Sequence, residues 1–339
     1  MMISPVTSIT RAATRKIKEP LNILTFPTHE RYESMLAKCG HNFYAYRAQG
    51  IKDWNTNYAD IPDNYFLLDP DLGEEQIPEY VDFDLVLSQN KFGQFQIAKK
   101  LAGMLHLPLV SLEHTLPIPT WGEDVLESTR QMRGHLNLFI SRYSIDAWGW
   151  QEGKDTLVIT HGVDTDLFKP NNEVEREDHI LSVVNDWINR DWCCGFGIWQ
   201  NVIKGLPFKV VGDTPGLSEP ASSTEELVAS YQNSRIFLNT STISPVPTAL
   251  LEAMSCGCAI VTTATCMIPE IVENGVNGFI SNDMDELKEY LVMLLNDEDL
   301  AEKMGKAARK TIVDRFSVER FASKWDFILN TASKKVFVG

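Results

Sequence analysis

Residues 245–278 read PVPTALLEAMSCGCAIVTTATCMIPEIVENGVNG, and this stretch decides the fold. It predicts a short helix over 248–254, a Cys-Gly-Cys turn, a buried strand over 259–263, a loop, and a second helix opened by Pro269. That order suits the helix–strand–helix half of a parallel α/β sheet. Glu252 lies inside the apolar helix. Because a buried unpaired charge is costly, its carboxylate is expected to face solvent or the hydroxyls of a ligand.

Short apolar runs upstream continue the same alternation of strand and helix. A chain of 339 residues suits two domains, since one domain usually takes ~100–200 residues. The unit 83–112 (strand, helix, strand) fits the right-handed crossover of a parallel sheet. Buried strands are predicted at 21–26, 83–88, 107–112, 136–141, 156–160, 179–184, 208–211 and 236–239, with one or two more and long loops in 43–80.

Helices are predicted wherever apolar residues recur at helical spacing behind a capping residue. A helix capped at Asp283 places Leu287, Leu291 and Leu294 on one face, and the last helix, from Ser317, does the same with its own apolar residues. The remaining predicted helices cover 32–38, 95–105, 142–148, 223–232 (opened by a capping box) and 303–315 (a basic helix).

The overall charge is acidic, with one basic segment. The formal net charge of −15 and the pI near 4.9 argue against a surface built broadly to bind nucleic acid or anionic lipid. Residues 1–20 carry four basic residues and one acidic residue, a net of +3, which leaves −18 for the rest. This segment is interpreted either as an arm that steers toward a phosphate-rich acceptor or as a solvated tail. The basic residues are Arg11, Arg15, Lys16 and Lys18.

The spacing of the cysteines and the lengths of the apolar runs indicate the cellular compartment of the protein. No C-x-x-C pair and no histidine at zinc spacing occurs, so no metal site is expected and the thiols are interpreted as reduced. No apolar run approaches the ~20 residues of a membrane span, and the N-terminus lacks a signal-peptide core. The sequence thus predicts a cytoplasmic protein without a transmembrane segment. The cysteines are Cys39, Cys193, Cys194, Cys256, Cys258 and Cys266.

The run LLEAMSCGCAIVTT followed by IPEIVENGVNGFI resembles the nucleotide-sugar-binding segment of the large retaining glycosyltransferase family of GT-B fold. That family includes glycogen synthases and bacterial mannosyltransferases. The stretch HGVDTDLFKP, residues 161–170, similarly resembles its interdomain connector. The resemblance implies an α/β fold with two Rossmann-like domains whose parallel sheets face a central cleft. After the basic segment 1–20, the expected domains are an acceptor domain 21–170, a donor domain 171–316 and a C-terminal helix 317–339 that crosses back.

The resemblance also implies a donor site on the second domain, with departures from the family pattern. Glu252 takes the place of the glutamate that holds the nucleotide ribose, but Ser244 replaces a second glutamate that touches the sugar. The Arg and Lys that clasp the diphosphate are replaced by Asp186 and Asp191. Arg190 is the cation available there, and it either binds phosphate, which suits a guanidinium, or pairs with one of these aspartates.

Backbone groups complete the expected donor site. Gly212 and Asp213 match the family's strand end near the nucleotide base. Pro247 is expected in the first turn of the following helix, which leaves the N–H groups of Thr248 and Ala249 to receive the diphosphate with the helix dipole. Since these groups can replace the charge of a metal, no divalent ion or other cofactor is expected to be required.

The acceptor side is expected at the carboxyl ends of the first domain's strands, where ligands gather in α/β sheets. Thr28, His29 and Glu30 follow the first strand and either face the cleft or form a capping turn, with Thr28 or Glu30 satisfying free N–H groups.

Two later strand ends complete this acceptor side. His114 lies where the family has a histidine beside the sugar, and it is interpreted either as a catalytic candidate or as a structural histidine. Ser141 and Arg142, at the end of strand 136–141, are placed on the same side of the cleft.

The leading hypothesis is a metal-independent retaining glycosyltransferase. It would move a hexosyl or pentosyl group from a nucleotide-diphosphate-sugar co-substrate to a hydroxyl of a glycan or small molecule. His114, Arg190 and Glu252 are the predicted catalytic set. One alternative is transfer to hydroxymethylated bases of DNA held by the basic arm. Another is a non-catalytic module that binds a nucleotide or glycan, which the missing Arg/Lys pair and the missing glutamate favour.

Overall fold

The computed structural model describes residues 10, 13, 19–47, 53–69, 71–72, 76–78 and 81–335. The chain divides into two compact units: residues 1–160 with 319–339 form the first, and residues 161–318 form the second. The basic residues of the predicted N-terminal arm, Arg11, Arg15, Lys16 and Lys18, lie outside the described residues. DNA binding through that arm therefore stays a prediction.

The first unit is built on a parallel sheet, which has seven strands in the described residues, in the order β3-β2-β1-β4-β5-β6-β7. Every neighbouring pair in it is parallel, so all the carboxyl ends lie along one edge. The strands are β1 (Asn22–Thr25), β2 (Asn42–Tyr46), β3 (Tyr65–Leu68), β4 (Leu85–Ser88), β5 (Leu109–Glu113), β6 (Leu136–Phe139) and β7 (Thr156–Val158).

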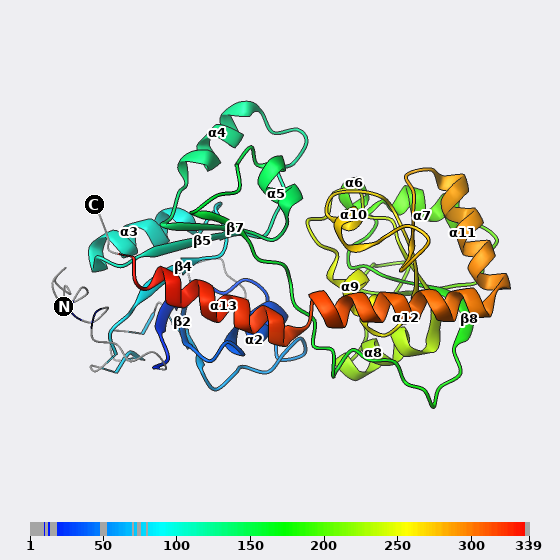
Figure 1. Cartoon of the computed structure of the whole chain (residues 1–339), viewed down its shortest axis with the longest axis horizontal. Coiled ribbons are helices and arrows are strands. Elements are labelled where there is room, and N and C mark those ends of the chain that lie inside the picture. The colour runs from blue at the N-terminus through cyan, green and yellow to red at the C-terminus, as the bar shows by residue number, and fades with distance from the viewer. Residues whose placement is uncertain are drawn as a thin grey trace. The chain divides into compact units, whose positions relative to one another are not determined.

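Helices cover both faces of this sheet. Figure 1 shows α3, α4 and α5 on one side of it and α2 and α13 on the other. On the second side, the rings of Tyr32 and Phe321 pack edge to face at 5.4 Å, which ties the C-terminal helix to the first unit. The helices are α2 (Glu30–Ala37), α3 (Phe95–Leu105), α4 (Glu123–Gln131), α5 (Arg142–Ala147) and α13 (Val318–Ala332).

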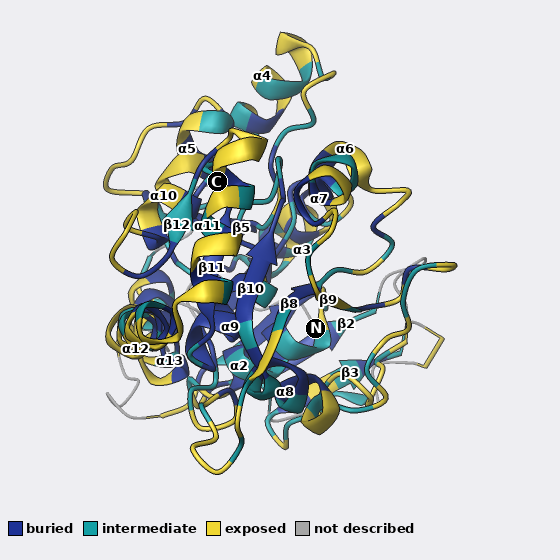
Figure 2. Cartoon of the chain, turned by 90° about the vertical axis from the view of Figure 1, so that its right-hand side faces the viewer, coloured by how far each residue is buried: buried dark blue, intermediate teal, exposed yellow. Residues whose placement is uncertain are grey.

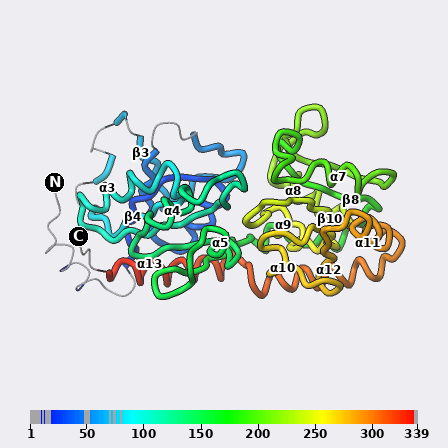
Figure 3. Tube along the Cα trace, turned by 90° about the horizontal axis from the view of Figure 1, so that it is seen from above, coloured from blue at the N-terminus to red at the C-terminus, as the bar shows by residue number. Residues whose placement is uncertain are grey.

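The second unit holds a smaller parallel sheet, five-stranded in the described residues, in the order β12-β11-β10-β8-β9. The strands are β8 (Glu177–Val183), β9 (Phe208–Val211), β10 (Ser234–Asn239), β11 (Ala259–Thr262) and β12 (Phe279–Ile280). The helices are α6 (Asp191–Cys194), α7 (Phe196–Val202), α8 (Thr224–Asn233), α9 (Thr248–Ser255), α10 (Ile268–Ile271), α11 (Met284–Asn296) and α12 (Glu298–Arg315). In Figure 3, α11 and α12 follow one another as the orange part of this unit.

The central strand β10 is buried on both faces, as its dark blue ribbon in Figure 2 shows. Side chains alternate along a strand, so Ile236 and Leu238 face the cluster that contains Trp199 of α7, while Phe237 faces Tyr231 of α8. Strands covered on both faces read as continuous apolar runs, which is why these were recognisable in the sequence. The predicted face of α11, with Leu287, Leu291 and Leu294, is fully buried in the same cluster.

Residues 161–170 belong to the second unit, so the division lies at 160/161 instead of 170/171. Val163 exchanges backbone hydrogen bonds with Phe316 and Val318, at 2.8 and 2.9 Å. The carbonyl of Phe168 accepts hydrogen bonds from Ser255 Oγ at 2.6 Å and Arg309 Nη1 at 2.8 Å. These bonds satisfy backbone groups that would otherwise be buried without partners, and they hold the segment to α9 and α12.

Several element boundaries differ from the expectations. The basic helix expected from 303 begins at Glu298, because Asp297 caps it by accepting a hydrogen bond from Leu300 N at 2.9 Å. Pro247 precedes α9 as its N-cap with ψ of 104° instead of occupying the first turn. In the capping box, Ser223 accepts from Glu226 N as expected, but the Glu226 carboxylate accepts from Ser222. None of the helices in the described ranges is long and apolar enough to cross a membrane.

Candidate functional site

The second unit presents four loops at the carboxyl ends of its strands β8, β9, β10 and β11. They cover residues 184–190, 212–223, 240–247 and 263–267. Because the strands are parallel, these loops lie along one edge of the sheet. All the predicted donor residues except Glu252 lie in these loops or at the N-terminus of α9.

The loops after β8 and β9 are bonded to each other around Gly212. Its φ of 135° belongs to glycine, and an added Cβ would collide with the carbonyl oxygen of Val184. Asp213 N donates to Asn185 Oδ1 at 2.9 Å, and Asp186 N donates to the Asp213 carbonyl at 2.6 Å. The two predicted base-side residues, Gly212 and Asp213, are therefore held rigidly beside the loop that carries Arg190.

The loop after β10 is hydrogen-bonded to helix α6 and to the residue that follows this helix. The carbonyl of Cys193 accepts hydrogen bonds from Thr242 N at 2.9 Å and Ile243 N at 3.1 Å. Thr240 Oγ1 donates to the Gly195 carbonyl at 2.9 Å. Ser244, which follows directly, is half-buried and has no hydrogen-bond partner within the described residues. Its hydroxyl is thus available to a ligand.

Arg190 is the exposed residue that precedes α6. The two aspartates that were its alternative partners are engaged elsewhere: Asp186 Oδ1 accepts from Asn189 at 2.7 Å, and Asp191 Oδ1 accepts from Gly197 N at 2.8 Å. In the described part of the chain, neither carboxylate forms an ion pair with Arg190. The interpretation of Arg190 as a surface partner of these aspartates is therefore not favoured, and its binding of phosphate stays a prediction.

Glu252 lies on α9 and is 8% exposed. The sequence led us to expect solvent or a ligand around its carboxylate, but Tyr231 Oη donates a hydrogen bond to Oε2 at 2.9 Å. This internal donor was missed because Tyr231 lies on another helix, and nothing in its local pattern announces a polar contact. A carboxylate has room for about four hydrogen bonds, so this contact leaves acceptor capacity for ribose hydroxyls.

The N-terminus of α9 is next to this glutamate in sequence. Pro247 is buried as the N-cap, so Thr248 and Ala249 are the first two helical residues, half-buried or exposed. The N–H groups of the first helical turn have no intrahelical acceptor, and the helix dipole favours an anion there. Thr248 and Ala249 are thus the first helical residues although Pro247 lies one position earlier than expected, and their binding of a diphosphate stays a prediction.

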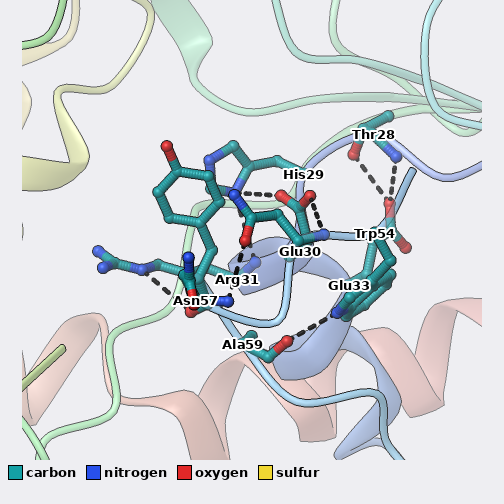
Figure 4. Close-up of polar contacts among 10 residues, drawn as sticks. Thr28, His29, Glu30, Arg31, Glu33, Trp54, Asn57 and Ala59 are labelled. Atoms are coloured by element: carbon teal, nitrogen blue, oxygen red, sulfur yellow. Dashed lines mark hydrogen bonds and ion pairs between the residues drawn. The ribbon is translucent and has the colours of Figure 1, made fainter. Parts of the chain in front are cut away.

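At the carboxyl edge of the first unit, the loop after β1 acts as a capping turn (Figure 4). His29 is the N-cap of α2, and its Nδ1 accepts from Arg31 N at 3.3 Å. Thr28 donates from both N and Oγ1 to Glu33, at 2.9 and 2.8 Å, and Glu30 accepts from Asn55 N at 3.0 Å. The capping residue is therefore His29, in place of the expected Thr28 or Glu30, because a β-region residue directly before the helix is the one that can reach these N–H groups.

His114 follows β5 at the same edge, and its ring packs edge to face on Tyr32 at 4.5 Å. Next along the sheet, Ser141 caps α5 by accepting from Ser144 N at 2.9 Å and is fully buried. Arg142 is exposed, and its Nε lies 3.6 Å from Oε2 of Glu152. Parallel pairing thus brings the β1, β5 and β6 loops to one edge, but Ser141 is committed to its helix.

Two buried carboxylates of this edge, Glu33 and Glu113, were given no role from the sequence. Each is fully buried and hydrogen-bonded to loops that follow neighbouring strands. A polar residue directly after a buried strand was the available signal for Glu113. Among the described residues, no group of three or more His, Cys, Asp or Glu side chains is placed to hold a metal ion.

Comparison with known sequences gives a family for the second unit. Residues 220–311 match the model described as glycosyl transferases group 1. The N-acetyl-alpha-D-glucosaminyl L-malate synthase of Bacillus anthracis is 33% identical over 81 residues, 23% of this chain and 21% of that protein. An uncharacterized glycosyltransferase of Haemophilus influenzae is 25% identical over 203 residues, 53% of this chain and 57% of that protein. The chain thus spans about a fifth to somewhat over half of these relatives.

Solved structures resemble nearly the whole chain. HepE of Anabaena in complex with UDP superposes with a TM-score of 0.73 at 18% identity and covers 92% of this chain and 100% of that one. The sucrose-phosphate synthase of Thermosynechococcus elongatus gives a TM-score of 0.70 at 14% identity and covers 92% and 98%. The predicted GT-B architecture of two Rossmann-like parallel-sheet units is confirmed. The family match contains Glu252 and covers residues 220–311, so this part of the chain is similar to the group 1 glycosyltransferases, and the chain as a whole has the GT-B fold.

Proposed function

We propose that this protein transfers a sugar from a nucleotide-diphosphate-sugar donor to a hydroxyl group of a glycan or small molecule, with retention and without a metal ion. The observation that carries the proposal is Glu252, a nearly buried carboxylate on α9 inside the segment that matches group 1 glycosyltransferases. A carboxylate oriented by a phenol, that of Tyr231, is suited to receive two neighbouring ribose hydroxyls.

The donor diphosphate is assigned to Arg190 and the first N–H groups of α9. In the transfer, the bond from the sugar C1 to the diphosphate oxygen breaks, and negative charge grows on the departing phosphate. Fixed donors at that position stabilise the growing charge, since they need no reorganisation during the reaction. The acceptor hydroxyl passes its proton to the departing phosphate oxygen, and its oxygen forms the new bond to C1 on the face that the diphosphate leaves.

Ser244 is the group expected to set the choice of donor sugar. A hydroxyl replaces the carboxylate that the family places against the sugar, so this chain lacks one anionic acceptor there. We therefore expect a donor sugar other than the common hexoses, or a contact supplied by a different polar group. His114 is assigned to the sugar side from the first unit. HepE has been solved with UDP and with UDP and glucose, so uridine diphosphate sugars are the first donors to test.

A non-catalytic nucleotide-binding module is the second candidate. Two features favour it: aspartates at the positions of the missing Arg/Lys pair, and Ser244 in place of a glutamate. Release of nucleoside diphosphate separates the two functions, because a module binds the donor without cleaving it.

The experiment measures binding and turnover on the same variants. UDP and a panel of nucleotide sugars are screened by thermal shift, and donor cleavage is followed as released nucleoside diphosphate. Glu252→Gln, which keeps an oxygen for Tyr231 but removes the charge, is expected to weaken UDP binding by about 10- to 100-fold, the value of a charged hydrogen bond of ~1.5–3 kcal/mol. Arg190→Ala should lower turnover at least as much as binding.

The matched control is Glu289→Gln, an exposed carboxylate on α11 of the same unit. It should leave affinity and turnover unchanged. Binding without any diphosphate release would favour the module, and equal affinities for wild type and Glu252→Gln would refute the assigned donor site.

A further inference from the structure

Glu33 joins two neighbouring loops of the first unit. The residue lies on α2 and is fully buried. Its Oε1 accepts from Thr28 N at 2.9 Å and Thr28 Oγ1 at 2.8 Å, which belong to the loop after β1 (Figure 4). Gln89, the first residue after β4, donates from Nε2 to both carboxylate oxygens at 2.9 and 3.0 Å. One carboxylate thus ties the β1 loop to the β4 loop.

Glu113 does the same one strand further along. It ends β5 and is also fully buried. Its Oε1 accepts from Thr115 N at 2.8 Å and Thr115 Oγ1 at 2.6 Å, while Oε2 accepts from Lys91 N at 2.8 Å. Thr115 follows His114 in the β5 loop, and Lys91 lies in the turn after β4. This second carboxylate ties the β4 loop to the β5 loop.

The two ties form one continuous clasp. Strands β1, β4 and β5 are neighbours in the sheet and run parallel, so their three loops follow one another along the carboxyl edge. Gln89 and Lys91 belong to the same turn, which is therefore held from both sides. The outer loops carry His29 and His114, which the sequence placed on the acceptor side. Residues of these loops supply the hydrogen bonds given above to both carboxylates, so neither needs a substrate to be satisfied.

The burial of these two carboxyl groups is not explained by a gain in stability. Burial raises the pKa of both carboxyl groups, which means that the fold disfavours their charged forms. Apolar residues of similar size would fill the same space without the desolvation penalty. A buried carboxylate that binds donors on two neighbouring loops therefore points to a role in fixing those loops.

We propose that Glu33 and Glu113 are positioning residues that fix the β1 and β5 loops in the conformation that receives the acceptor. The inference rests on the proposed glycosyltransferase function for its kinetic consequence. The carboxylates themselves touch no substrate, so their removal should change the acceptor KM and leave donor binding on the second unit unchanged.

The test replaces a hydrogen-bond acceptor with a donor in the contact between Glu33 and Gln89. Glu33→Gln retains an oxygen for Thr28 but turns an NH2 group toward the NH2 group of Gln89, and two donors cannot bond. We expect the acceptor KM to rise about tenfold, with UDP affinity within twofold of wild type. Glu113→Gln, which faces Lys91 N with a donor, should raise the acceptor KM similarly.

Hydrogen exchange provides a readout independent of activity. The Thr28 amide should exchange at least tenfold faster in Glu33→Gln, and the Thr115 amide should stay slow in that variant. Glu319→Gln, an exposed carboxylate on α13 of the same unit, should change none of these quantities.

Three outcomes overturn the clasp: an unchanged acceptor KM in an active enzyme, equal rises in acceptor and donor KM, or unchanged Thr28 exchange. An inactive wild type would refute the proposed function instead, and the exchange rates would still decide whether the carboxylates fix the loops.

Discussion

The two units hold the loops at their carboxyl edges in different ways. In the first unit, two buried carboxylates join three loops, with Glu33 accepting from Thr28 and Gln89. In the second unit, buried neutral groups do this work: Thr263 Oγ1 and Thr265 Oγ1 both donate to the Ser241 carbonyl at 2.6 Å. Carboxylates bind several N–H donors at once but resist burial, whereas hydroxyls and carbonyls carry no net charge. The first edge should therefore respond to pH, and the second should respond mainly to packing.

Glu252 is the instructive exception in the second unit. It lies on a helix instead of a loop, and its internal hydrogen bond comes from a phenol, Tyr231, instead of from backbone N–H groups. The contrast separates a carboxylate that fixes structure, such as Glu33, from one that is suited to a ligand.

The largest expected effect comes from a substitution that disrupts the packing of the loops at the carboxyl edge of the second unit's sheet. An added Cβ at Gly195, whose φ is 66°, would collide with the Thr240 carbonyl oxygen and separate α6 from the β10 loop. Gly195→Ala should lower the free energy of unfolding by about 4 kcal/mol, as overpacking adds to backbone strain. Gly205→Ala is the matched control, because Gly205 also has positive φ (83°) but no atom lies within 4 Å of its added Cβ.

That control should cost only the strain of a left-handed residue, about 1–2 kcal/mol. The measurement is native-state hydrogen exchange of β10 amides, which reports on the second unit separately. Similar losses in both variants would show that the contact between Gly195 and Thr240 contributes no rigidity to this edge.

The second prediction concerns the pH dependence of stability that the buried carboxyl group of Glu33 gives to the first unit. Burial raises the pKa of Glu33 in the folded protein, although hydrogen bonds from Gln89, Thr28 and Tyr65 oppose the rise. A raised pKa contributes stability below the unfolded pKa near 4.5, and that contribution is lost as pH rises through the folded pKa. Wild type should therefore lose stability relative to Glu33→Gln as pH increases, by up to ~1.4 kcal/mol for each unit of the rise.

The check is hydrogen exchange of β1 and β4 amides at several pH values, corrected for the intrinsic exchange rate. β10 amides serve as the internal control, since they belong to the other unit and should show no difference between the two proteins. A stability difference that grows in favour of wild type at higher pH would have the wrong sign.

The central strands and the apolar helices could be predicted from the sequence because the spacing of apolar residues within each segment indicates which residues are buried. The strand 208–211 and the helix Phe95–Leu105 agree with the structure to the residue. The helix α4 was missed, since Thr129 is its one buried residue and it shows no apolar stripe. Local pattern fails there because little of the helix is covered.

The candidate site was less predictable because its contacts are long-range. The bond between Tyr231 and Glu252 joins residues 21 positions apart on different helices. Glu33 did carry a local signal, since it lies on the same helical face as Leu36 and Ala37, which are buried. An acid on an apolar stripe indicates a buried polar contact, but its partner Gln89 is 56 positions away and is brought close only by β-strand pairing.

The smallest expected effect compares one helix cap from each unit. Asp283 caps α11 by accepting from Asp285 N at 2.8 Å and Glu286 N at 3.2 Å, while His29 caps α2 through one longer bond from Arg31 N at 3.3 Å. Asp283→Ala should cost about 1–2 kcal/mol, and His29→Ala about 0.5 kcal/mol or less.

Exchange of the first-turn amides of α2 and α11 measures both caps. His29 can accept only while Nδ1 is unprotonated, and burial lowers its pKa, so its cap should persist below pH 6.5 and weaken only on further acidification. Exchange of the first-turn amides of α11 in the same protein is the reference for this comparison. Equal losses for the two alanine variants, or an α2 cap that is independent of pH, would mean that the His29 side chain does not hold the start of α2.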